Sequence, residues 1–246
     1  FVARRGKGEP LQLISGKVPF RYITVLVAPN VLIPRPETEV LVSEAFAELN
    51  LPRVADHVAA GENGEEVVSP ELPELRVVDL CTGSGCIACS IASEYPAAHV
   101  VALDIAPEAL ALAGKNVEVL GLGNRIEVLE SDLLGALDPG KKGTFDLIVS
   151  NPPYVPTKVC DSLPREVSEW DSRLALDGGE DGLDLFRRFL PDALSYLKPG
   201  GVLAVELFEG HLEQARNGAC AAGFDQARIA LDLTGRPRVL IARKPR

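Results

Sequence analysis

From residue 76 onward, short apolar runs alternate with segments of helical spacing, and this alternation limits the fold more than any other feature of the sequence. The run RVVDL (76–80) ends in leucine just after an acid, and helical spacing follows over 85–95. A later helix is predicted over 107–122, with Pro107 at its first position, which suits proline. Strand, helix and strand in succession form a parallel unit, so the pattern predicts a parallel sheet with helices on both faces.

The spacing predicts seven strands, over 76–80, 99–104, 125–131, 145–150, 202–207, 228–233 and 237–244. Further helices are predicted over 181–197 and 210–222. The last two strands have no helix between them, so they must pair as a hairpin, and one of them is antiparallel. We therefore predict an α/β fold with a doubly wound, mostly parallel seven-stranded sheet that ends in an antiparallel hairpin.

The first 75 residues follow another pattern. The segment VPFRYITVLVAPNVLIP (18–34) predicts two strands around an APN turn. A helix is predicted over 35–49, with Pro36 near its start and Glu37 and Glu39 near its positive end. Residues 52–74 are rich in Pro, Gly and Glu, which predicts an exposed loop.

Composition narrows the class of protein. Hydrophobic residues make up 46% of the 246 and charged residues 24%, as in globular domains. No apolar run is long enough to cross a bilayer, and the start of the chain lacks the apolar core of a signal peptide, so we expect a cytoplasmic setting. The net charge of −10 weighs against a broad nucleic-acid surface. Five cysteines, an odd number, favour reduced thiols, and we expect no metal site.

The segment VVDLCTGSGCIA (77–88) places a glycine-containing turn between a strand and a helix. Ligands of doubly wound sheets bind at such turns, and Gly83 and Gly85 would let the backbone approach a ligand closely. Asp79, at the strand end, is ill-placed for a pyrophosphate, because like charges repel. It suits a ligand that carries an ammonium and a sulfonium, so S-adenosylmethionine fits this loop better than NAD.

Two further acids follow the next two strands. Asp104 ends the second strand, where a carboxylate can accept hydrogen bonds from both hydroxyls of a ribose. Asp132 follows the third strand and could accept a hydrogen bond from an adenine amino group. Together with the loop, these acids predict an S-adenosylmethionine site.

At the fourth strand end the sequence reads NPPY (151–154), a stiff segment because proline has a fixed φ and no N–H. A planar amide or amine has two N–H donors, and the Asn151 side-chain oxygen and the Pro152 carbonyl could each accept one. Tyr154 could stack on the planar group. The nitrogen would then face a methyl donor, and we predict that Asn151, Pro152 and Tyr154 carry the transfer by positioning.

These motifs resemble those of class I S-adenosylmethionine-dependent methyltransferases, which have a Rossmann-like fold and act here on planar nitrogen. The segment LIPRPETEVLV (32–42) narrows the resemblance to the release factor glutamine methyltransferases, and residues 8–22 and 173–190 are also similar to that family. The resemblance implies a methyltransferase domain over 35–246. It implies that 1–34 are a remnant of the family's N-terminal domain and a linker β-hairpin.

The resemblance also implies the reaction and its site. A methyl group would pass from S-adenosylmethionine, leaving S-adenosylhomocysteine, to the glutamine side-chain nitrogen in the Gly-Gly-Gln motif of a peptide chain release factor. The residues implied to contact the cofactor are Cys81, Thr82, Gly83, Ser84, Gly85, Asp104 and Leu133. With Asp79, Asp132 and Asn151 they make up the predicted cofactor site. Those implied to hold the glutamine are Asn151, Pro152, Pro153 and Tyr154. Cys81 stands where the family usually has glycine, and Leu133 where some members have an aromatic residue.

Other interpretations stay open at this point. The acceptor could be a glutamine of a ribosomal protein, or the amino group of a flipped adenine in DNA, which is also planar with two hydrogens. The chain could also bind the cofactor without activity. Trp170 could pack its loop or border the cleft, Arg35 could face a peptide or pack at the helix entry, and GGEDGLD (178–184) could shape the site or be a solvated helix start.

Overall fold

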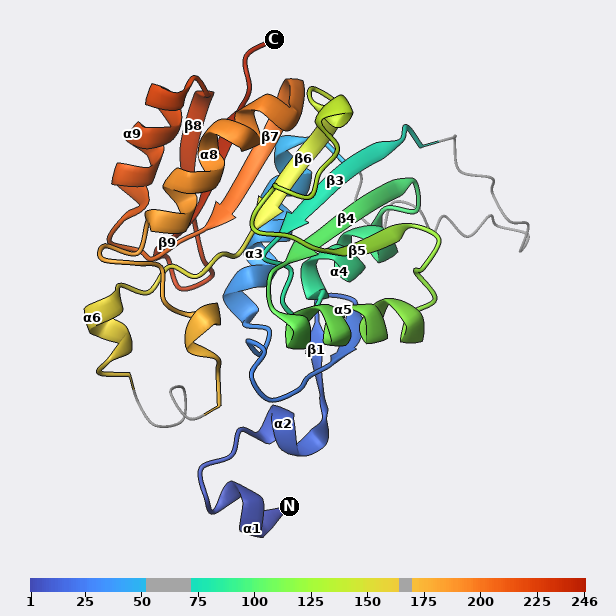
Figure 1. Ribbon diagram of the computed structural model, residues 1–246, viewed down its shortest axis with the longest axis vertical. Coiled ribbons are helices and arrows are strands. Elements are labelled where there is room, and N and C mark those ends of the chain that lie inside the picture. The colour runs from blue at the N-terminus through green and yellow to red at the C-terminus, as the bar shows by residue number, and fades with distance from the viewer. Residues whose placement is uncertain (52–71, 164–169) are drawn as a thin grey trace.

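A computed structural model describes residues 1–51, 72–163 and 170–246 and contains a central seven-stranded sheet (Figure 1). The strands are β3 (Leu75–Leu80), β4 (Ala98–Asp104), β5 (Ile126–Glu130), β6 (Phe145–Ser150), β7 (Leu197–Glu206), β8 (Asp225–Leu231) and β9 (Pro237–Arg243). Their order across the sheet is β5-β4-β3-β6-β7-β9-β8, and only the pairings of β9 are antiparallel. The predicted sheet with its antiparallel C-terminal hairpin is confirmed.

The order of strands reverses at β3. The chain runs from β3 outward to β4 and β5, then returns to place β6 on the other side of β3. The carboxyl ends of β3 and β6 are adjacent, with Leu80 opposite Ser150. The glycine-containing turn and NPPY, which follow these two residues, therefore meet at the switch point where open α/β sheets bind ligands.

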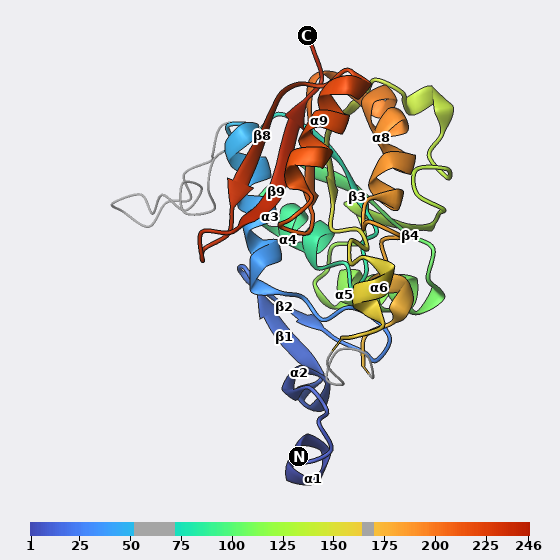
Figure 2. The ribbon, with the colours of Figure 1, turned by 90° about the vertical axis from the view of Figure 1, so that its left-hand side faces the viewer.

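Helices cover both faces of the sheet (Figure 2). On one face lie α3 (Pro36–Glu48), α4 (Cys86–Glu94) and α5 (Pro107–Val119), and on the other lie α8 (Asp184–Tyr196) and α9 (Leu212–Ala222). Successive strand residues serve the two layers alternately: Val77 packs in the first cluster and Val78 in the second. Cys86 and Cys89 are buried in the first cluster, as small core residues.

The N-terminal segment holds two short helices and a hairpin: α1 (Val2–Arg5), α2 (Leu11–Ser15), β1 (Lys17–Phe20) and β2 (Ile23–Leu26). The prediction of an APN hairpin turn is wrong, because the hairpin turns at Arg21 and Tyr22, where Arg21 has a φ of 49°. Asn30 also has a positive φ of 66°, so APN does form a turn, but beyond the hairpin. Whether residues 1–34 are a remnant of another domain stays a prediction.

Strand β7 begins at Leu197, five residues earlier than the sequence predicted. The KPGG segment (198–201) is part of the strand, with Leu197 opposite Phe145 and a register shift before Val202 pairs with Leu147. Backbone hydrogen bonds join the two glycines of this segment, Gly200 and Gly201, to Lys244, which follows β9 on the other side of β7. Glycine and proline weaken a strand prediction, yet here the irregular register accommodates them.

Three short elements complete the description: η2 (Pro139–Lys141), α6 (Thr157–Cys160) and η3 (Arg173–Ala175). Of the loop predicted over 52–74, residues 52–71 lie outside the described part. Within the described residues, every helix is too short or too polar to span a bilayer.

Candidate active site

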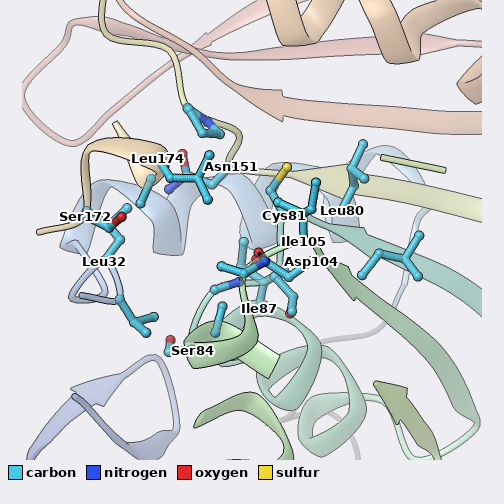
Figure 3. A pocket seen from close by; sticks show the side chains of 18 of the residues that line it. Leu32, Leu80, Cys81, Ser84, Ile87, Asp104, Ile105, Asn151, Ser172 and Leu174 are labelled. Carbon is cyan, nitrogen blue, oxygen red and sulfur yellow. Dashed lines mark hydrogen bonds between the residues drawn. The ribbon is translucent and has the colours of Figure 1, made fainter. Parts of the chain in front are cut away.

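A cavity lies at the carboxyl ends of β3, β4, β5 and β6, and the residues that follow all four strands contribute to its wall. Figure 3 shows Asn151 and Leu174 at one side of it and Asp104 toward the other. The predicted site residues that line it are Cys81, Thr82, Gly83, Ser84, Asp104, Asp132, Leu133, Asn151 and Pro153. Four predicted residues are outside this lining: Asp79, Gly85, Pro152 and Tyr154.

The glycine-containing turn has three positive φ angles, at Cys81 (59°), Gly83 (57°) and Gly85 (77°). A Cβ at Gly85 would lie 3.1 Å from that of Ala113, so Gly85 permits close packing of this turn on α5 instead of contacting the cavity. Cys81 adopts a conformation that costs an L-residue roughly 1–2 kcal/mol. This explains why glycine suits position 81.

Asp79 lies beneath the turn and is fully buried. Its Oδ2 accepts hydrogen bonds from the Thr82 hydroxyl (2.5 Å) and the Ala88 amide (3.1 Å). Burial raises the pKa of Asp79 to about 7, although these hydrogen bonds oppose the shift. In this position Asp79 holds the turn and the start of α4. Its contact with a cationic ligand stays a prediction.

Asp104 joins the turn to β4. Its Oδ2 accepts from the Gly83 amide (2.9 Å) and its Oδ1 from the Ala106 amide (3.0 Å). Each carboxylate oxygen keeps a second lone pair, so Asp104 can still accept hydrogen bonds from two hydroxyls in the cavity. Asp132 is more exposed and pairs with Arg188 of α8 at 2.8 Å.

A buried asparagine that sequence reasoning missed connects the hairpin to this turn. Asn116 of α5 accepts from the Leu26 amide (2.7 Å) and donates to the carbonyls of Leu26 (3.1 Å) and Ser84 (2.9 Å). In the sequence, Asn116 is a polar residue next to Val117, which belongs to the apolar stripe of the predicted helix. The hairpin is thereby fixed against the cavity wall.

Thr38 orients the carboxamide of Asn151. The Asn151 Nδ2 donates to the Thr38 hydroxyl of α3 at 3.1 Å. Its Oδ1 is buried and has no hydrogen-bond partner among the described residues. Asn151 lines the cavity, so an acceptor oxygen is left available to a ligand there. Thr38 belongs to the RPETE segment, in which sequence reasoning assigned it no role.

Tyr154 is turned toward the end of β7. Its hydroxyl donates to Glu206 Oε1 at 3.0 Å, and its ring packs with the second core cluster. Burial, with the nearby Glu206 carboxylate, raises the pKa of Tyr154. Stacking of Tyr154 on an acceptor stays a prediction, since this ring is not part of the cavity wall.

Two loops meet at the mouth of the cavity. Arg35 lines the cavity and pairs with the buried Asp171 at 2.9 Å. Burial raises the pKa of Asp171, while the guanidinium opposes this effect. Trp170 is not part of the lining, and its carbonyl accepts from the Asn30 amide at 3.4 Å. Arg35 therefore joins the start of α3 to Asp171 and also lines the cavity, while the roles of Arg35 toward a peptide and of Trp170 stay predictions.

Two glycines of the GGEDG segment (178–182), Gly178 and Gly182, pack closely against the main chain of NPPY. The Gly178 amide donates to the Val155 carbonyl (2.9 Å), and a Cβ at Gly178 would lie 2.7 Å from both the Pro153 carbonyl oxygen and the Tyr154 Cα. At Gly182 a Cβ would lie 2.3 Å from the Tyr154 carbonyl oxygen. This segment shapes the site through its backbone, one of the two possibilities left open by the sequence.

Replacing Gly178 with alanine is expected to displace the NPPY backbone, because all three atoms closest to the added Cβ are main-chain atoms. Overpacking of this kind costs about 1–3 kcal/mol of stability, and a misplaced site can lower a rate by roughly 100-fold. Thermal unfolding and the rate of methyl transfer measure the two effects. Gly114→Ala is the control, since a Cβ there meets nothing within 4 Å; equal behaviour of the two variants would contradict this account.

Known proteins resemble this chain in sequence and in fold. A methyltransferase small domain model matches residues 62–164. Release factor glutamine methyltransferases are 43% identical in Geobacter sulfurreducens (98% of this chain, 75% of the relative) and 39% identical in Koribacter versatilis (99% and 78%). The one from Caulobacter vibrioides is 38% identical (99% and 76%).

Solved structures support the fold. The N-terminal domain of human METTL16 in complex with SAH superposes with a TM-score of 0.61 at 16% identity, covering 89% of this chain and 74% of that one. The ribosomal protein L11 methylase from Lactobacillus delbrueckii subsp. bulgaricus has a TM-score of 0.55 at 18% identity, covering 89% and 84%. With its fold shared by methyltransferases and its sequence matched along nearly its whole length, the chain belongs to the release factor glutamine methyltransferase family.

Proposed function

We propose that this protein transfers a methyl group from S-adenosylmethionine to the side-chain amide nitrogen of the glutamine in the Gly-Gly-Gln motif of peptide chain release factors. The observation that carries the proposal concerns Asn151, which lines the same cavity as Asp104 and whose buried Oδ1 has no hydrogen-bond partner among the described residues. The relatives of this chain are named release factor glutamine methyltransferases, and family membership supports a release factor glutamine as the acceptor here.

The residues of the cavity fit the methyl donor. Asp104 can accept from ribose hydroxyls, and apolar side chains such as Ile105 and Leu133 can enclose an adenine. The Ser84 hydroxyl lines the cavity, is buried and has no partner in the described part of the chain, so it can meet a polar group of the ligand. When bound, S-adenosylmethionine supplies an electrophilic methyl group on its sulfonium.

On the acceptor side, the protein acts by positioning. Asn151 Oδ1 and the Pro152 carbonyl would each accept one N–H of the glutamine amide, while Pro153 and Tyr154 would complete the substrate site. An amide nitrogen is a poor nucleophile, and well-oriented reactants can gain roughly 7–11 kcal/mol from positioning. The proton can leave once the nitrogen carries the methyl group, so no general base is needed before the transfer.

The same two acceptors would also suit the amino group of an adenine in DNA, or the glutamine of a ribosomal protein. The net charge of −10 favours a protein acceptor over DNA. We place the reaction in the cytoplasm. Transfer of labelled methyl should be strong to a purified release factor and weak to DNA or ribosomal proteins. Preferred transfer to DNA, with binding that falls steeply as salt is raised, would overturn the proposal.

Asp104→Ala is expected to weaken binding of S-adenosylmethionine about 10- to 150-fold, because hydrogen bonds to a charged group are worth about 1.5–3 kcal/mol. Calorimetry measures this effect directly. Asp132→Ala should weaken binding less, since Asp132 is exposed and already paired with Arg188. NAD binding as tight as that of the methyl donor would contradict the assignment of the cofactor.

A further inference from the structure

The short helix η3 presents an exposed apolar side chain to one side of the cavity. Leu174, in the middle of η3, is 58% exposed and lines the cavity, as does the partly buried Leu32. Figure 3 shows Leu32 and Leu174 on the same side of the cavity as Asn151, with Asp104 toward the other. A single exposed leucine is normal on a protein surface. This one lies where the buried Oδ1 of Asn151 is left without a partner among the described residues.

An ion pair and a backbone hydrogen bond fix η3 at its two ends. Before the helix, Asp171 pairs with Arg35 at the start of α3, at 2.9 Å. After the helix, the Leu176 carbonyl accepts from the amide of Val155, the residue after NPPY, at 2.9 Å. The helix is therefore held in place before an acceptor arrives, and a contact made by a preorganised side chain costs little conformational entropy on binding.

The glutamine side chain has an apolar part that such a leucine suits. Its amide is joined to the main chain by two methylene groups. When the amide nitrogen donates to Asn151 Oδ1, these methylene groups lie between that oxygen and the mouth of the cavity. An apolar wall on this side removes the methylene groups from water, and its own apolar surface is buried in return.

We propose that Leu174 is an acceptor-binding residue, which packs together with Leu32 on the methylene groups of the glutamine whose amide Asn151 holds. The inference rests on the function proposed above. The contact is the same before and during the transfer, so it strengthens binding of the release factor without changing the rate of the bound complex. It does not involve the methyl donor, which Asp104 and the turn after β3 hold.

Three substitutions of Leu174 test the proposal in the full chain. Leu174→Ala should raise KM for a release factor about 5- to 20-fold, because roughly half of a leucine side chain is no longer buried on binding, and kcat should stay within about twofold of wild type. Leu174→Asp should raise KM further, since its charge would lose water on binding. Leu174→Met keeps an apolar side chain of similar volume and should behave like wild type. Because the side chain is exposed, the midpoint of thermal unfolding should be unchanged in all three, as should the affinity for S-adenosylhomocysteine measured by calorimetry.

Leu231→Ala is the matched control. Leu231 is 54% exposed, ends the edge strand β8 and is outside the cavity lining, so its removal should leave KM unchanged. Three results with Leu174→Ala would each overturn the proposal: an unchanged KM, a fall in kcat at unchanged KM, or a loss of affinity for S-adenosylhomocysteine that matches the rise in KM. The last result would place Leu174 at the cofactor. Failure of the wild-type protein to methylate any release factor would instead reject the underlying function.

Discussion

Asn151→Ala is expected to slow methyl transfer roughly 100- to 1,000-fold, as when one positioned donor or acceptor is removed from a dry active site at a cost of about 2.7–4 kcal/mol. The alanine removes the buried Oδ1 that has no other partner in the described structure. Cofactor affinity should change far less, because the turn after β3 and Asp104 hold that ligand. Rates at saturating cofactor and release factor, beside calorimetry, measure both effects.

Asn151→Asp gives the sharper comparison, since it keeps an oxygen and the shape of the side chain. It replaces the donor to Thr38 with another acceptor and adds a charge to a partly buried position. Because a buried charge without a paired ion is costly, we expect the aspartate to be as slow as the alanine. A near wild-type rate in Asn151→Ala would mean that NPPY is only a stiff turn.

Arg21→Ala is expected to lower the free energy of unfolding by about 3–5 kcal/mol, because it leaves the charge of Glu94 buried and unpaired. The pair is bidentate, with both N–O distances 2.6 Å, and the side chains are only 11% and 2% exposed. Arg21 also donates to the Glu39 carbonyl (2.8 Å) and to Ser43 of α3. Denaturant unfolding measures the loss.

Two further variants separate the charge effect from lost packing. Glu94→Gln in the Arg21→Ala background should recover part of the stability, because it removes the unpaired charge. Arg216→Ala breaks an exposed pair with Glu213 on α9 and should change stability little. An Arg21→Ala variant as stable as Arg216→Ala would show that this ion pair contributes nothing.

The sheet and the position of the cavity could be predicted from sequence, because alternating strand and helix patterns have few allowed topologies. The turn after β3, Asp104 and Asn151 each lie at the carboxyl end of a strand, so they were expected to converge, and they line one cavity. The hairpin turn was misplaced for a physical reason. Arg21 adopts a positive φ while its side chain is held by Glu94, and no local pattern in the sequence indicates that contact.

The residues that sequence reasoning missed act across long separations. Thr38 and Asn151 are 113 positions apart, and Asn116 and Leu26 are 90 apart. Such contacts depend on how α3 and α5 pack against the rest of the fold. Hydrophobic spacing predicts the buried face of a helix, but it does not predict which single side chains will meet. The same holds for Tyr154, whose hydroxyl donates to Glu206, 52 positions away in the sequence.

Mapping of the transferred methyl group is the most direct test of the proposed reaction. The protein is incubated with labelled S-adenosylmethionine and a release factor, and the modified peptide is sequenced by mass spectrometry. We expect one methyl group on the side-chain nitrogen of the glutamine in Gly-Gly-Gln, and no labelling of a release factor in which that glutamine is alanine. Undiminished labelling of the alanine variant, or a methyl group on another residue, would contradict it.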